Sequence, residues 1–239
     1  QPSQPSQPSQ PSQPSQPSQP SQPSQPSQPS QPSQPSQPSQ PSQPSQPSQP
    51  SQPSEPELKF IDVNEGDWFY NSVMWAVKNG VTVGTTPTTF EPYTACTRAQ
   101  MIEFLWNAVG KPAATIKSVP FTDVPESGSD DYWYEDSLLW AYEAGIVAGT
   151  NDGSTFSPDQ VCTRAEMISF IARLLSDGAT ADMPFVDVPA SAWYYNEVQW
   201  AWANGLTVGT NDGTTFSPDN ACIRAEAVEF LYNAFAEVE

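Results

Sequence analysis

The sequence Thr163-Arg-Ala-Glu166 stands directly before an apolar run that ends near Leu175. Its threonine hydroxyl can accept a hydrogen bond from the backbone amide of Glu166, and the glutamate carboxylate can accept one from the amide of Thr163. This reciprocal capping box is typical of a helix start. We therefore predict an α-helix that begins at this stretch, runs to Leu175 and buries one face.

The same pattern occurs three times along the chain. The other copies are Thr97-Arg-Ala-Gln100 and Ile223-Arg-Ala-Glu226. Ile223 carries no hydroxyl, so the third capping box is incomplete, and we expect a frayed or differently capped helix start there at a cost of about 1 kcal/mol. The three predicted helices run through Val109, Leu175 and Phe235.

Another helix is predicted upstream of each copy. Its marker is a tryptophan followed by alanine, at Trp75, Trp140 and Trp200, with a glycine five residues later that fits a left-handed helix cap. Apolar side chains near each tryptophan recur at helical spacing, which predicts that one face is buried. We expect these tryptophans to pack in the core, because they lie in the middle of their helices. The predicted helices cover residues 70–79, 135–144 and 195–204.

Each copy also opens with Phe-x-Asp-Val and carries Phe-x-Pro between its two helices, and the copies follow one another at about 60–66 residues. Repeats of this size bury their apolar faces against one another. The sequence therefore predicts an all-α fold of three tandem helix–loop–helix units, which we call modules 1, 2 and 3. Their predicted ranges are residues 56–112, 117–177 and 182–239.

The first part of the chain has a different composition. Residues 1–54 are an unbroken, uncharged Gln-Pro-Ser repeat that cannot bury enough apolar surface to fold, so residues 1–55 are predicted to be a disordered linker. The net charge of −19 therefore lies on residues 55–239, which argues against nucleic acid and anionic membranes as partners. No run of about 20 apolar residues is present, so we expect no membrane insertion.

Histidine is absent, which removes the commonest general base and metal ligand. We expect no cofactor and no catalytic activity. The acids in register across the modules supply one aspartate each, whereas a glycosidase needs two carboxylates around one bond. The cysteines occupy equivalent positions, and we expect them to be buried apolar residues rather than metal ligands. They are Cys96, Cys162 and Cys222.

The ordered set of Phe-x-Asp-Val, Trp-Tyr, Trp-Ala, Gly-x-x-x-Gly, Phe-x-Pro and Thr-Arg-Ala-Glu resembles the S-layer homology module, over residues 58–239. The resemblance implies a helical, pseudo-three-fold spindle made by one chain, a monomeric pseudo-trimer. It also implies extracellular, non-covalent attachment of a surface protein to the bacterial cell wall. The ligand of such modules is secondary cell-wall polysaccharide, commonly pyruvylated, or modified peptidoglycan.

Two other functions stay open at this point. The modules could form a self-assembling S-layer lattice or bind another protein. The chain could also be the C-terminal anchor fragment of a surface enzyme. Because we find no assembly domain beside the repeats, we favour anchoring.

Each predicted second helix carries an arginine as its first residue, where a cation opposes the positive end of the helix dipole. A carboxylate ligand would offset this, bound by the guanidinium and by free N–H groups of the helix start. The alternative is that each arginine pairs with a neighbouring acid, for example the aspartate of Phe-x-Asp-Val. If the sites are unequal, we expect Arg164 to bind best, because module 2 joins an intact Thr-Arg-Ala-Glu to a full Asn-Asp-Gly loop. The candidates are Arg98, Arg164 and Arg224 with Asp62, Asp123 and Asp187.

Aromatic residues directly before each predicted first helix are candidate platforms for the flat faces of sugars. They are Trp68, Trp133 and Trp193 with Tyr134 and Tyr194, and the alternative is packing in the core. A loop glycine in each module completes the predicted glycan-binding set, and the Asn-Asp-Gly loops are expected to form tight turns rather than calcium sites. The glycines are Gly84, Gly149 and Gly209.

Overall fold

The computed structural model describes residues 60–236, which contain six α-helices and no strand beyond isolated bridges. The all-α prediction is confirmed for this part of the chain, whereas the predicted linker lies outside it. None of these helices combines the length and apolarity needed to cross a membrane. The helices are α1 Tyr70–Lys78, α2 Arg98–Ala108, α3 Glu135–Glu143, α4 Arg164–Leu175, α5 Tyr195–Ala203 and α6 Arg224–Phe235, with a short 3₁₀ turn, η1, at Asn151–Gly153.

The starts of the second helices follow the predicted capping signals. In α4 the box is complete: Thr163 accepts from the amide of Glu166 at 3.2 Å, and Glu166 accepts from the amide of Thr163 at 2.8 Å. The box of α2 is complete as well. Helix α6 keeps only the bond from Ile223 N to Glu226, at 3.2 Å, yet it begins at Arg224 with similar cap dihedrals. The start of α6 is therefore differently capped rather than frayed, because it lacks only the hydroxyl bond.

The first helices also match their predicted signals. Each ends near a glycine in the left-handed region, with φ between 67° and 71°. Trp140 and Trp200 are buried, and Trp75 is partly buried against the core. The prediction that these tryptophans pack in the core is confirmed, in full for modules 2 and 3 and in part for module 1.

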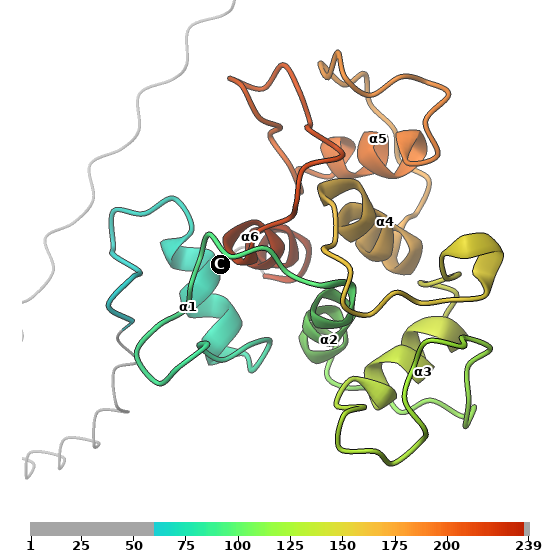
Figure 1. Ribbon diagram of the computed structural model, residues 1–239. Helices are drawn as coiled ribbons and strands as arrows, with labels where there is room; N and C mark the ends of the chain where they lie inside the picture. The colour runs from blue at the N-terminus through green and yellow to red at the C-terminus, as the bar shows by residue number, and fades with distance from the viewer. Residues whose placement is uncertain (1–59, 237–239) are drawn as a thin grey trace, which may run out of the picture. The chain divides into compact units, whose positions relative to one another are not determined.

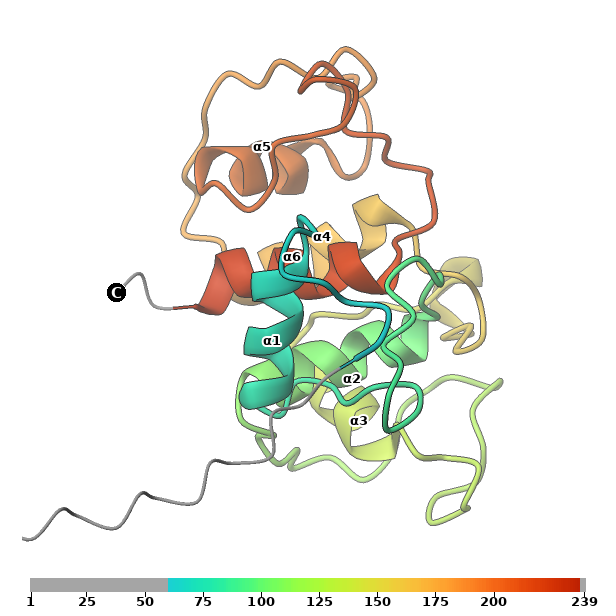
Figure 2. The same cartoon turned by 90° about the vertical axis from the view of Figure 1, so that its left-hand side faces the viewer.

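The helices are arranged in two layers around a centre. Helices α2, α4 and α6 contact one another in the middle, and α1, α3 and α5 lie outside them (Figure 1). Each outer helix packs on the central helix of the preceding module: α3 on α2, α5 on α4, and α1 on α6. The last pair joins the first and last helices of the described residues (Figure 2). The modules thus close into a ring with pseudo-three-fold symmetry, as the resemblance implied.

The cysteines mark the centre of this ring. Cys96 N donates to the carbonyl of Cys222 at 3.0 Å, Cys162 N to that of Cys96 at 2.9 Å, and Cys222 N to that of Cys162 at 2.9 Å. All three side chains are free thiols without solvent exposure, and burial raises the pKa of Cys96 to about 12. The prediction that the cysteines are buried is confirmed, and their backbones form a closed cycle of hydrogen bonds between the modules.

Candidate functional site

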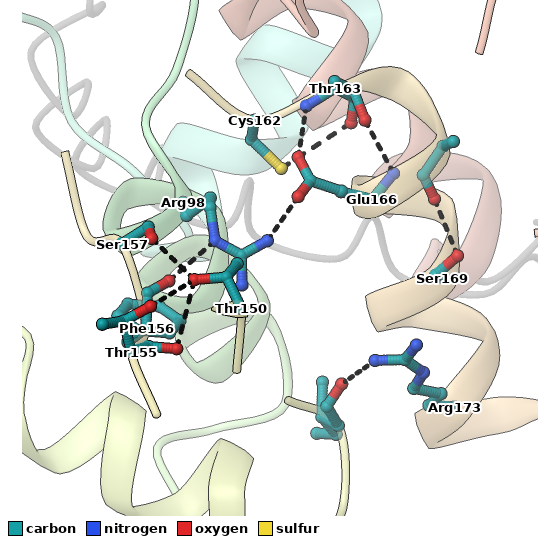
Figure 3. Close-up of polar contacts among 12 residues, drawn as sticks. Arg98, Thr150, Thr155, Phe156, Ser157, Cys162, Thr163, Glu166, Ser169 and Arg173 are labelled. Carbon is teal, nitrogen blue, oxygen red and sulfur yellow. Dashed lines mark hydrogen bonds and ion pairs between the residues drawn. The ribbon is translucent and has the colours of Figure 1, made fainter. Parts of the chain in front are cut away.

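Arg98, the first residue of α2, reaches out of module 1 into module 2. Its Nε donates to the carbonyl of Phe156 at 2.9 Å, and its Nη1 donates to Glu166 Oε1 at 2.6 Å (Figure 3). The guanidinium carbon lies 5.2 Å and 5.4 Å from the ring centres of Phe156 and Phe170. Only 4% of the residue is exposed. The arginine therefore joins two modules through a buried ion pair and two aromatic faces.

The other two arginines occupy equivalent places, but their partners differ. Arg164 Nη1 donates to Glu226 Oε1 of module 3 at 2.6 Å. Arg224 projects into module 1, where Gln100 replaces the glutamate, and its Nη2 donates instead to the carbonyl of Val83 at 3.2 Å. No carboxylate within residues 60–236 forms an ion pair with Arg224, and burial lowers the pKa of its guanidinium.

The alternative that the arginines pair with a neighbouring acid is confirmed for Arg98 and Arg164, but the acid is a glutamate. The aspartates of Phe-x-Asp-Val, suggested as partners, bind backbone instead. Asp123 accepts from the amides of Phe156 and Ser157 at 2.8 Å and 2.7 Å. Asp62 and Asp187 make the same contacts in their own modules. Ser157 has a left-handed φ of 58°, and the two bonds hold this strained turn. Each aspartate thereby positions the phenylalanine carbonyl that an arginine of the preceding module reaches.

The first amides of the second helices are already bonded. Arg98 N donates to the carbonyl of Gln160 at 2.9 Å, and Ala99 N donates to that of Pro158 at 3.1 Å. Carbonyls of modules 3 and 1 close the starts of α4 and α6 in the same way. The expectation that free N–H groups at these helix starts bind a carboxylate is therefore wrong, because packing between modules uses those donors.

A cleft of about 200 Å³ lies beside α4, lined by residues of all three modules. Figure 3 shows Glu166, Ser169 and Arg173 along α4, with Arg98 entering from α2. Trp193 of module 3 is 58% exposed, so an accessible aromatic ring borders a charged floor. We call this site the α4 cleft. Its lining residues are Arg98, residues 148–150, Glu166, Ser169, Phe170, Arg173 and Trp193.

The structure brings Arg98, Gly149 and Trp193 from the predicted set to the α4 cleft. Arg164 reaches into module 3, where it contacts Phe216 and Glu226. It therefore does not share a site with the module 2 loop, on which its predicted preference is based. Four residues of the cleft were not predicted from the sequence: Glu166, Ser169, Phe170 and Arg173. Glu166 and Arg173 are seven residues apart, a spacing that places two side chains on one face of a helix, and this spacing could have identified them.

The aromatic candidates separate into two groups. The tryptophans before α1 and α3 are each 55% exposed, similar to Trp193. Tyr134 and Tyr194 are only 4% and 9% exposed, which leaves almost no surface for a glycan, and burial raises the pKa of Tyr134 to about 12. The equivalent residue in module 1 is Phe69, which is also buried. We therefore correct the prediction for the two tyrosines, which belong to the core.

Gly149 has a packing role that explains its residue type. A Cβ atom at this position would lie 2.6 Å from Phe121 Cε1 and 2.7 Å from the carbonyl of Thr155. Gly84 and Gly209 approach the equivalent phenylalanines in the same way. The missing side chain lets each loop lie on the phenylalanine of Phe-x-Asp-Val, and in module 2 this places residues 148–150 at the edge of the α4 cleft.

A model of the S-layer homology domain matches residues 59–102, 120–168 and 184–228, which together are more than half of the chain. The chain belongs to the S-layer homology domain family. A cell surface protein of Thermoanaerobacter kivui is 35% identical over 133 residues, and the surface-layer 125 kDa protein of Lysinibacillus sphaericus is 34% identical over 93 residues. These matches cover 53% and 39% of this chain, but only 16% and 8% of those proteins.

The S-layer homology modules also match part of an enzyme. An endoglucanase of Bacillus sp. (strain KSM-635) is 33% identical over 114 residues, which are 48% of this chain and 11% of that protein. Each of the three relatives is therefore matched over less than a fifth of its length. Surface proteins and an endoglucanase share the modules, which supports a role in attachment to the cell surface rather than in one reaction.

Proposed function

We propose that residues 56–239 anchor a surface protein to the bacterial cell wall by binding an acidic wall glycan, without a covalent bond and without catalysis. Secondary cell-wall polysaccharide, in particular a pyruvylated one, and modified peptidoglycan are the candidate ligands. The protein is then extracellular, and one chain supplies the whole pseudo-trimeric site.

The α4 cleft is the observation that carries this proposal. It combines the exposed guanidinium of Arg173 with an exposed indole ring, and these are the groups that suit a carboxylate and the apolar face of a sugar. Its volume is below the roughly 300 Å³ at which small-molecule pockets begin. A short segment of a glycan, rather than a long stretch, fits a site of this size.

Co-sedimentation of the full chain with purified cell walls tests the proposal. We expect binding to walls that carry their secondary polymer, and loss of binding once that polymer is extracted. The variant Trp193→Ala should bind more weakly, whereas Tyr93→Ala, which removes a 68% exposed ring outside the cleft, should bind like the wild type. Equal binding to intact and extracted walls would overturn the proposal, and sedimentation without walls would favour lattice assembly.

A further inference from the structure

One position distinguishes the α4 cleft from the two equivalent sites of the ring. Nine residues after its first arginine, α4 carries Arg173, whereas α2 carries Asn107 and α6 carries Asn233. All three side chains make the same bond to the segment that follows the first helix of their module: Arg173 to the carbonyl of Ile146 at 2.9 Å, and the two asparagines to the equivalent carbonyls at 2.9 Å and 3.3 Å. Asparagine therefore suffices for the structural contact.

Arg173 has a positive charge and N–H donors that this contact does not use. Only its Nη1 donates a hydrogen bond within residues 60–236, and no carboxylate in this part of the chain pairs with it. Arg98, across the cleft, is neutralised by Glu166. Ser169, which lines the same cleft and lies between Glu166 and Arg173 along α4, adds no charge. A solvent-exposed cation with free donors thus lies in a cleft beside an exposed tryptophan.

The equivalent helices differ from α4 at two positions. Where α4 has Ser169, α2 has Glu103 and α6 has Glu229, so each of those helices adds a carboxylate and lacks the second arginine. On α5 the acid Glu197 stands where α1 has Ser72 and α3 has Ser137, and its Oε2 is buried without a hydrogen-bond partner in the described residues. Glu197 neither lines the cleft nor forms an ion pair with Arg173. Among the three central helices, only α4 carries a second arginine, and this arginine lines the α4 cleft without an ion-pair partner in the described residues.

We propose that Arg173 determines specificity for a carboxylate-bearing sugar, and that it makes the α4 cleft the acid-selective site of the three. This inference rests on the proposed glycan binding. The carboxylate receives hydrogen bonds from the free N–H groups of Arg173 while the sugar ring lies against Trp193. Arg98 acts mainly as a positioning residue, because its guanidinium is already bonded to Phe156 and Glu166.

Isothermal titration of the full chain tests the role of Arg173, with purified secondary wall polymer as the probe in two forms: native, and with its carboxylates reduced to alcohols. We expect Arg173→Asn to bind the native polymer about tenfold more weakly, the scale of one partly exposed charge-assisted hydrogen bond. Binding of the reduced polymer should not change. Arg173→Lys should restore part of the preference, and the melting temperature of Arg173→Asn should stay near that of the wild type, because asparagine makes the same carbonyl bond in modules 1 and 3.

The reciprocal variant is Glu229→Ser with Asn233→Arg, which gives α6 the residues of α4. We expect a second acid-selective site and a higher stoichiometry for the native polymer. Equal binding of Arg173→Asn and wild type to the native polymer would overturn the inference while leaving glycan binding intact, and so would an equal loss for both polymers, which would indicate a packing role. Failure of the wild type to bind either polymer would instead overturn the proposed function and the inference with it.

Discussion

The arginine that joins modules 2 and 3 has a carboxylate partner, whereas the arginine that joins modules 3 and 1 has none within residues 60–236. Arg164 and Arg224 are similarly buried, at 4% and 6% exposure, and each guanidinium lies between two phenylalanine rings. Arg164 forms an ion pair with Glu226, whereas Arg224 meets module 1, where Gln100 stands at the glutamate position. One buried arginine is thus neutralised, and the other is held by neutral oxygen atoms.

This difference separates two roles that the glutamate of Thr-Arg-Ala-Glu combines. Glu226 binds Arg164 with Oε1 and the amide of Ile223 with Oε2. Gln100 keeps only the capping role, because its one oxygen accepts from Thr97 N at 3.0 Å and its amide nitrogen cannot accept from a guanidinium. Helix capping and pairing between modules are therefore independent, and each can be changed by one substitution.

The largest expected effect comes from removing the arginine on each side of this comparison. Arg164→Met should lower the free energy of unfolding by roughly 3 kcal/mol or more, because it leaves the carboxylate of Glu226 without its partner. Arg224→Met leaves only neutral acceptors unpaired, so we expect a smaller loss of roughly 2 kcal/mol. Urea denaturation of both variants measures the difference, and equal losses would contradict the assigned roles of the two pairs.

The same burial affects how the arginines can be probed. Replacing Arg98, Arg164 or Arg224 disturbs the packing between modules. A loss of glycan binding after Arg98→Ala would therefore not show whether Arg98 contacts the glycan or only supports the fold. Trp193 and Arg173 are exposed at the cleft and avoid this difficulty.

The helices could be predicted from the sequence because their signals are local. Capping by Thr163 and Glu166 involves residues three apart, and the glycine caps lie directly after their helices. The site could not be predicted in the same way. Arg98 meets Glu166 across 68 residues, and no spacing rule distinguishes that partner from Asp62 or Asp123. The correct partner follows only from the fact that each module packs on the next one.

Exchanging glutamine and glutamate should make the Arg164 and Arg224 contacts more alike in the stability that they contribute. Glu226→Gln should lower the free energy of unfolding by about 1–2 kcal/mol, because the charge-assisted bond to Arg164 is lost while capping stays. Gln100→Glu should raise it by up to about 1 kcal/mol, because it offers Arg224 a carboxylate. Thermal unfolding in low and high salt checks both changes. A stabilising Glu226→Gln would show that desolvation outweighs the ion pair.

The stability of module 1 should also depend on pH through a buried carboxyl group. Burial raises the pKa of Glu103, a residue of α2, although the nearby Ser137 hydroxyl and Lys111 ammonium oppose the shift. A raised pKa in the folded state means that the contribution of this group to stability is fully present below its unfolded-state pKa and is lost as pH rises through the folded-state value. Glu103→Gln should therefore be more stable than the wild type at pH 7, by less than the preceding effects, with the advantage vanishing near pH 4. Unfolding free energies measured across this range give the result, and a constant difference at all pH values would show that Glu103 does not titrate as assigned.

The smallest expected effect concerns the cap of α6, which differs from the cap of α4 by one hydroxyl group. Ile223→Thr should add the missing bond to the amide of Glu226 and raise the free energy of unfolding by about 0.5 kcal/mol, less than the usual value of about 1 kcal/mol, because the partly buried isoleucine loses apolar contact. Thr163→Ile makes the opposite change in α4 and should lower it by about 1 kcal/mol. Both variants keep the arginine pairs, so glycan binding should not change. Comparing their unfolding with wild type by urea titration separates capping from pairing, and a loss of wall binding in Thr163→Ile without a loss of stability would show that the cap also shapes the α4 cleft.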